Sequence, residues 1–285
     1  MDRTHRDAVA ETGVDERGMS DAQVQAYRRE GICFPFTAMS AERASAYRAR
    51  LEAFERQYGS RGAEVLRQKS HLALTFVDEL IRLEPVLDKV QTLLGPDILC
   101  WSTSFFIKNP GDGKFISWHQ DAQYWRPEAD DVVTAWIALT PSTPESGCMR
   151  VVPASHTRIV EHNDTRAENN MLTRGQEVAV EVDERTAWDV TLMPGEFSLH
   201  HERIIHGSRP NQGRDRRIGL AVRYVKPSAR QVKEASDSAM LVRGTDVHGH
   251  FLPEPRPRAD MDPAGVKFLD ELLSKRAGGA YRAGS

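Results

Sequence analysis

The chain has few of the features that mark secreted, membrane-bound or nucleic-acid-binding proteins. Only three of its 285 residues are cysteines, and their odd number and wide spacing argue against a disulfide framework. No apolar run approaches the roughly 18 residues that a membrane-spanning helix needs, and the polar N-terminus is unlike a signal peptide. The formal net charge is only -3, so neither nucleic acid nor a membrane surface is expected as a partner. We therefore expect a cytoplasmic protein that acts on a small molecule, with an oligomeric state that the sequence leaves open.

What the chain does have is the composition of a globular protein. Its 40% of hydrophobic residues suffices for a sizeable core. Residues 1–18 are charged and aperiodic, which predicts a flexible leader. Residues 19–285 are expected to form one domain, with a helical part at 19–97, a strand-rich core at 98–228, and a tail with a short helix at 229–285.

The first part of this domain carries apolar residues at helical spacing. Ser20 and Gly31 bracket a predicted short helix as its N-cap and its stop. A short strand is expected at 32–36, and Ser40 is predicted to cap a longer helix that runs to residue 58. The stretch 72–94 is interrupted by Pro85, which predicts two helices in place of one.

From residue 98 onward the pattern changes to short apolar runs separated by turn residues. Strands are predicted at 98–107, 132–139, 149–152, 178–182, 190–193, 196–200 and 218–225. Many short strands in succession indicate an antiparallel sandwich or barrel. Because the helices precede the strands and do not alternate with them, a parallel α/β sheet is disfavoured. The predicted fold is mainly β with flanking helices (α+β), built on a double-stranded β-helix or jelly roll.

His119 and Asp121, separated by one residue, are the most informative pair in this core. On a strand, residues two apart project to the same face, so an imidazole and a carboxylate could reach one point. A second histidine, His206, would complete a set of two histidines and one carboxylate. That set leaves half of an octahedral metal open, which suits non-haem Fe(II) and oxygen chemistry. A surface turn also explains a lone His-x-Asp pair, so the pair needs support from elsewhere in the chain.

Three further residues bear on this site. His200 and His201 are close rivals of His206, and because neighbouring strand residues alternate faces, at most one of these two points into a pocket. Arg217 precedes a predicted strand, and a guanidinium there could hold the far carboxylate of a dicarboxylate that chelates the metal. On spacing alone, a solvated charge in the run Arg214-Asp-Arg-Arg217 is the better interpretation.

Four sequence motifs decide whether these residues form a metal site or are ordinary surface residues. Their order and spacing along the chain match those of one known family. The motifs are Trp118-His-Gln-Asp-Ala-Gln-Tyr-Trp125, Val133-Thr-Ala-Trp-Ile-Ala-Leu139, Gly147-Cys-Met-Arg-Val-Val-Pro-Ala-Ser-His156, and His206-Gly-Ser208 followed by Arg217. Together they resemble the phytanoyl-CoA dioxygenase family of Fe(II)- and 2-oxoglutarate-dependent oxygenases, over residues 27 to 226. The resemblance implies a jelly-roll core.

The resemblance also implies a role for each matching residue. His119, Asp121 and His206 correspond to the iron ligands, and Arg217 and Ser208 to the groups that bind the far carboxylate of 2-oxoglutarate. The remaining cosubstrate contacts it implies are Trp136, Lys69 and Ser104. For Lys69, an exposed charge beside a helix is an equal alternative. Residues expected to line the substrate pocket are Tyr124, Trp125, Met149 and one of His200 and His201.

The implied activity uses O2 to hydroxylate a C–H bond of a small metabolite or natural-product intermediate, while 2-oxoglutarate is decarboxylated to succinate and CO2. Related halogenases lack the carboxylate ligand, so Asp121 favours hydroxylation; desaturation and ring formation stay open. No coenzyme A site is recognisable in the sequence. Two other functions are weighed against this one: a jelly-roll protein that binds a small ligand without turnover, and a zinc hydrolase with the same three ligands, which would leave Arg217 and Ser208 unexplained.

Overall fold

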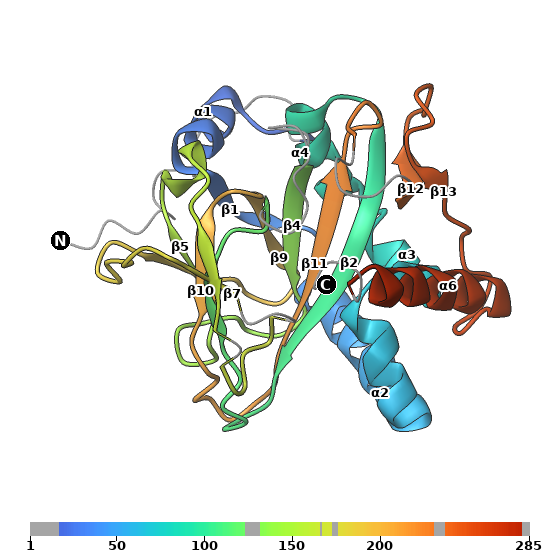
Figure 1. The fold of residues 1–285 in the computed structure, drawn as a ribbon, viewed down its shortest axis with the longest axis horizontal. Helices are drawn as coiled ribbons and strands as arrows, with labels where there is room; N and C mark the ends of the chain where they lie inside the picture. The colour runs from blue at the N-terminus through green and yellow to red at the C-terminus, as the bar shows by residue number, and fades with distance from the viewer. Residues whose placement is uncertain (1–16, 123–131, 166, 173–175, 231–236, 281–285) are drawn as a thin grey trace.

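The computed structural model describes residues 17–122, 132–165, 167–172, 176–230 and 237–280, and within them two β-sheets face each other (Figure 1). The larger sheet has the strand order β1 (Ile32–Thr37), β9 (Glu196–His201), β4 (Val132–Ala138), β11 (Arg217–Val225), β2 (Ile98–Lys108), β12 (Ser238–Arg243) and β13 (Leu252–Pro253). The smaller sheet has the order β3 (Ile116–His119), β10 (Ile205–Ser208), β5 (Met149–Val152) and β8 (Trp188–Val190). A separate pair joins β6 (His162–Asp164) and β7 (Gln176–Val178). This is the predicted jelly roll.

Helices flank the two sheets. They are α1 (Asp21–Glu30), α2 (Ala41–Arg67), α3 (Thr75–Leu80), α4 (Glu84–Leu94) and α6 (Pro263–Ala280), with 3-10 turns at Ser70–Leu72 and Ser155–Thr157. In Figure 1, α2, α3 and α6 lie together beside β2, on the side away from the smaller sheet. No helix in the described ranges is both long and apolar enough to cross a membrane.

Successive side chains of β4 alternate between two hydrophobic clusters, one between the larger sheet and the helices and one between the two sheets. Val133, Ala135 and Ile137 belong to the cluster that packs against the helices. Trp136 and Ala138 point the other way and belong to the cluster between the two sheets. The interior between the sheets therefore receives every second residue of each strand, and most residues of the candidate site are among them.

The helix boundaries follow the predicted caps, with one difference. Ser20 makes a capping box with Gln23, and Gly31 ends α1 in the left-handed conformation at φ 79°, as predicted. Ser40 caps α2 as predicted, but α2 continues to Arg67 and does not stop near residue 58. Gly59, at φ 52°, interrupts the helix without ending it, because glycine can adopt that conformation at little steric cost.

Most strands are confirmed, but two are displaced. The strands predicted at 178–182 and 190–193 lie earlier in the structure, since β7 ends at Val178 and β8 ends at Val190. The apolar residues that suggested longer strands, such as Val180 and Met193, are exposed at 40% and 44%. The predicted C-terminal helix is present as the longer α6. Residues 1–16 of the predicted leader lie outside the described residues.

Candidate metal centre

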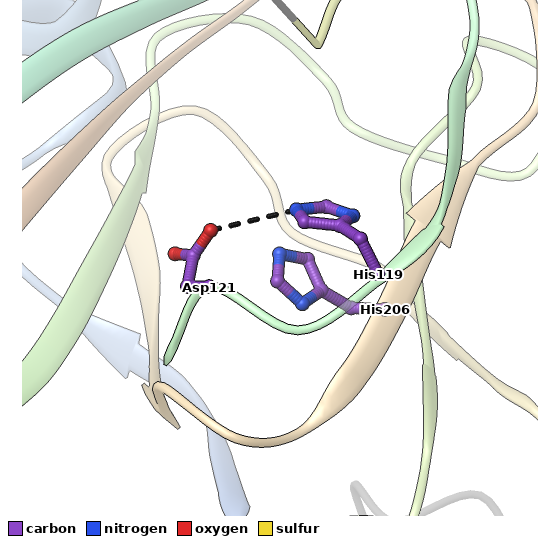
Figure 2. A group of neighbouring side chains, drawn as sticks. All are labelled: His119, Asp121 and His206. Carbon is purple, nitrogen blue, oxygen red and sulfur yellow. Dashed lines mark ion pairs between the residues drawn. The ribbon is translucent and has the colours of Figure 1, made fainter. Parts of the chain in front are cut away.

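The three predicted ligands meet at one point between the sheets. His119 ends β3 and is the direct cross-strand partner of His206 in β10, and the centroids of the two rings lie 4.1 Å apart. One ligand atom from each of His119, Asp121 and His206 lies within 4.8 Å of the other two, and all three residues are buried. Figure 2 shows the three side chains converging, with His119 and Asp121 joined as an ion pair. This donor set and spacing suit one metal ion.

Asp121 reaches this point in a different way from the one predicted. The strand ends at His119, so Asp121 is in the following turn and does not share a strand face with the histidine. The residue between them anchors the turn: Gln120 Nε2 donates to the carbonyls of Arg158, at 2.8 Å, and Arg203, at 2.5 Å. The turn brings Asp121 Oδ1 to 3.4 Å from His119 Nε2. A buried glutamine thus orients the two ligands on either side of it.

The hydrogen bonds of the two histidines fix which ring nitrogen faces the metal. His119 Nδ1 donates to the carbonyl of Ser117 at 2.9 Å, and His206 Nδ1 donates to that of Ile204 at 3.0 Å. Both Nε2 atoms then carry the free lone pair. Burial holds the pKa of His206 well below its usual value, which keeps this ring neutral. These are the states that a metal requires.

Asp121 is kept ionised by its neighbours. Burial alone would raise the pKa of this carboxyl, but Arg223, His119 and His206 outweigh burial and hold the pKa well below its usual range. Arg223 Nε lies 3.7 Å from Asp121 Oδ2. The carboxylate is therefore ready to bind a cation at any pH near neutrality.

The alternation of β9 separates the two rival histidines. The ring of His200 lies 5.3 Å from that of His206, whereas His201 lies against Tyr27 and His156 at 6.4 and 5.1 Å. His200 therefore faces the metal centre and His201 faces away. Burial lowers the pKa of His200 to about 4, so this ring is neutral at pH 7.

Arg217 occupies the other end of the same interior face. Its side chain is 1% exposed, and its guanidinium carbon lies 5.3 Å from the centre of the Trp136 ring. The ring fits there because Gly219 has no side chain: a Cβ on Gly219 would lie 1.9 Å from Trp136 Cζ2. Within the described ranges Arg217 forms no ion pair with a carboxylate; its Nη1 donates to the carbonyl of Phe106 at 3.4 Å, and its Nε has no hydrogen-bond partner. A buried positive charge without a counter-charge is energetically costly, so an anionic ligand beside this guanidinium would stabilise it.

Lys108 is a site residue that sequence reasoning missed. It is the direct partner of Arg217 in the β2–β11 pairing and is fully buried. Its Nζ donates to Ser208 Oγ at 2.6 Å and to the carbonyl of Arg209 at 2.5 Å. Burial, together with Arg217, lowers its pKa to about 6. The signal was available, since Ser104 and Lys108 are four residues apart on one strand and so share a face.

The other predicted site residues have mixed outcomes. Ser104 accepts a hydrogen bond from Arg223 at 3.2 Å, and Met149 packs in the same interior cluster as Trp136. Tyr124 and Trp125 lie outside the described residues.

Both alternatives given for Lys69 are wrong in this structure. The residue is 1% exposed, so it is not a solvated charge. Its Nζ is 2.6 Å from Glu254 Oε1, and the same carboxylate bonds His71 at 2.7 Å. His71 Nδ1 in turn contacts Thr103, on the face of β2 opposite to Ser104. Lys69 therefore belongs to an ion cluster behind the larger sheet.

Comparisons with known proteins agree with this geometry. Residues 16–219 match the family model described as phytanoyl-CoA dioxygenase (PhyH). The chain is 28% identical over 173 residues to a probable alpha-ketoglutarate-dependent hypophosphite dioxygenase of Stutzerimonas stutzeri, a match that covers 57% of each protein. It is 25% identical over 218 residues to the ectoine dioxygenase of Nocardia farcinica, covering 66% of this chain and 72% of that enzyme.

Solved structures give a longer match. The non-heme monooxygenase ThoJ, in its apo form, is 34% identical with a TM-score of 0.80, and the match covers 89% of this chain and 95% of ThoJ. CytC3, solved with Fe(II) and alpha-ketoglutarate, is 23% identical with a TM-score of 0.62, covering 82% of this chain and 92% of CytC3, and so shares the fold.

Proposed function

Because the chain belongs to the phytanoyl-CoA dioxygenase family, we propose that it is an Fe(II)- and 2-oxoglutarate-dependent dioxygenase that hydroxylates a C–H bond of a small molecule. The observation that carries this proposal is the pairing of two sites on one interior surface. One is the His119, Asp121 and His206 cluster, and the other is the buried, uncompensated Arg217. Ser208 follows His206 by two residues on β10, about 7 Å along the strand, which suits a five-carbon dicarboxylate between them.

The protein would contribute binding, orientation and exclusion of water. When bound, the metal and cosubstrate supply the oxidation by O2, in which 2-oxoglutarate is decarboxylated to succinate and CO2. The three ligands present two neutral imidazoles and one carboxylate, leaving half of the coordination sphere for other groups. Arg217, with Lys108 and Ser208 beside it, holds the far carboxylate of the cosubstrate, and Trp136 packs along the guanidinium.

Asp121 supports hydroxylation over halogenation, because its carboxylate fills the place that a halide would need. The relatives named for hypophosphite and ectoine support a small, polar substrate. A zinc hydrolase using the same three ligands is less favoured, since it gives no role to the buried guanidinium of Arg217 or to the buried amine of Lys108. A binding protein without turnover is also less favoured, since the matched relatives are named as oxygenases.

The test is release of succinate from 2-oxoglutarate by purified protein, with and without Fe(II) and O2. Asp121→Ala should reduce succinate release to the level without metal, and should weaken Mn(II) binding measured by calorimetry. Asp164→Ala, which removes an exposed aspartate of β6, is the matched control and should behave as wild type. Equal turnover in Asp121→Ala and wild type would refute the proposal, and hydrolysis that needs zinc but not O2 would favour the hydrolase.

A further inference from the structure

The turn that carries Asp121 is held by hydrogen bonds on both sides of that residue. The backbone N–H of Gln120 donates to His162 Nε2 at 2.9 Å, and the N–H of Ala122 donates to the carbonyl of Glu202 at 2.9 Å. Asp121 lies between these two anchored peptide groups, beyond the end of β3. The place of its carboxylate therefore depends on segments that are distant in the sequence.

His162, the first residue of β6, has a hydrogen bond that fixes its tautomer. Its Nδ1 lies 2.9 Å from the carbonyl of Val160, and because a carbonyl only accepts, Nδ1 carries the proton. The lone pair of Nε2 is then available to accept the N–H of Gln120. Burial lowers the pKa of His162, which favours this neutral form. The ring thus serves the turn as a hydrogen-bond acceptor and lies outside the ligand cluster.

The side chain of Gln120 is bound to the same segment. Its Oε1 accepts from the N–H of Val160 at 2.9 Å, and its Nε2 donates to the carbonyl of Arg158 at 2.8 Å. With His162 included, three alternate residues of one short segment contact this glutamine, which is fully buried. Buried polar groups are costly to leave unpaired, so the turn and the segment 158–162 are held in one relative position.

The connection between β5 and β8 also holds the beginning of β3. Asn170 Nδ2 donates to Ser117 Oγ at 2.8 Å, and the N–H of Phe115 donates to the carbonyl of Asn169 at 3.1 Å. Strand β3 lies at the edge of the smaller sheet. Residues 169–170 thus hold one end of this edge strand, and residues 158–162 hold the end that carries His119.

We propose that His162 is a positioning residue of the metal centre: by accepting the N–H of Gln120, it fixes the turn that presents Asp121 to the metal. This inference rests on the metal centre of the proposed function and adds a residue to it. A neutral imidazole brings no charge to the site, so its effect is one of geometry. Groups that orient metal ligands typically contribute about 10–100-fold to metal affinity.

The experiment removes the acceptor and then restores it. His162→Phe keeps a flat ring but has no nitrogen to accept the N–H of Gln120, whereas His162→Gln can place an amide oxygen near the position of Nε2. His250→Phe is the matched control, because His250 is also a half-buried histidine, with its Nδ1 3.1 Å from the carbonyl of Ala229. Mn(II) binding is measured by calorimetry, and the absorption spectrum of Co(II)-saturated protein reports on the geometry of the ligands.

His162→Phe should weaken Mn(II) binding by about tenfold or more and should shift the absorption bands of bound Co(II). His162→Gln should bind Mn(II) within about threefold of the wild type, because one acceptor replaces another. His250→Phe should match the wild type in both measurements. Urea unfolding of each variant separates this effect from a general loss of stability, which would lower the unfolding midpoint but leave the Co(II) spectrum of the folded protein unchanged.

Three results would overturn the inference. They are an unchanged Mn(II) affinity in His162→Phe, an unchanged Co(II) spectrum in that variant, and equal losses of affinity in His162→Phe and His162→Gln. If His162→Phe does not fold, His162→Asn replaces it, because this shorter polar side chain does not reach the position of Nε2. Binding of Mn(II) to the wild type reports on the proposed function separately: without it both proposals fall, and with it an unchanged affinity in the variant removes only the role of His162.

Discussion

Lys108 allows the cosubstrate site to be tested through its protons. The pKa of this buried amine falls from 10.5 to about 6 because of burial and the charge of Arg217. At pH 7.5 the amine is therefore neutral in almost every unliganded molecule. A carboxylate bound beside Arg217 would raise the pKa of Lys108, because an opposite charge favours the protonated form. Binding of 2-oxoglutarate should then take up a proton.

The size of this effect follows from the pKa. At pH 7.5, about 1.5 units above the pKa, protonating the amine costs about 2 kcal/mol, and close to one proton is taken up per site. At pH 5.5 most molecules already carry the proton, so uptake falls to about a quarter of one. The dissociation constant of 2-oxoglutarate should rise about tenfold for each pH unit above 6, until the pH approaches the raised pKa of the bound state.

Calorimetry on Mn(II)-loaded protein, in buffers of different ionisation enthalpy at both pH values, measures the proton uptake directly. Lys108→Met should remove both the uptake and the slope with pH while leaving Arg217 in place. Equal proton uptake in Lys108→Met and wild type at pH 7.5 would refute the reasoning. So would an affinity that does not change between pH 6.5 and 7.5.

Three further predictions concern packing and stability. Gly219→Ala should displace the Trp136 ring, because the added Cβ would lie 1.9 Å from Trp136 Cζ2. The substitution should weaken 2-oxoglutarate binding tenfold or more with Mn(II) present, and an unchanged affinity would contradict this packing. Glu254→Gln should lower the free energy of unfolding in urea at pH 7 by about 3 kcal/mol, because it leaves Lys69 as an unpaired buried charge. Lys69 and His71 outweigh the effect of burial and lower the pKa of Glu254 from 4.5 to about 2. The wild type should therefore lose this stability as the pH falls from about 4.5 to about 2, whereas Glu254→Gln should show no such loss. The three cysteines are buried, so a thiol reagent should label none of them at pH 8 until denaturant is added, and rapid labelling of the native protein would count against the described packing.

The convergence of His119, Asp121 and His206 was predicted from the sequence because it depends largely on local features. His119 and Asp121 are neighbours in the chain, and the alternation of strand residues correctly limited the choice between His200 and His201 to one. The turn that carries Asp121 was not predicted, since it depends on carbonyls of Arg158 and Arg203 from distant segments.

The second half of the site shows why spacing alone was insufficient. Arg217 and Lys108 are charged residues, which are normally exposed, and only their pairing across two strands places them together in the interior. The position of Lys69 in the ion cluster behind the larger sheet also depends on a contact between distant parts of the chain. Its partner Glu254 is 185 residues away, and no local pattern connects the two.

Strand β2 carries two independent sets of contacts on its two faces. Ser104 and Lys108 point into the site, while Thr103 contacts His71 in the ion cluster behind the sheet. Substitutions at the interior positions can therefore change ligand preference during evolution without disturbing the cluster. Insertion or deletion of one residue within β2 would reverse both faces at once. New specificities in descendants of this chain should thus arise by exchange of interior residues, with changes in length confined to the connecting loops.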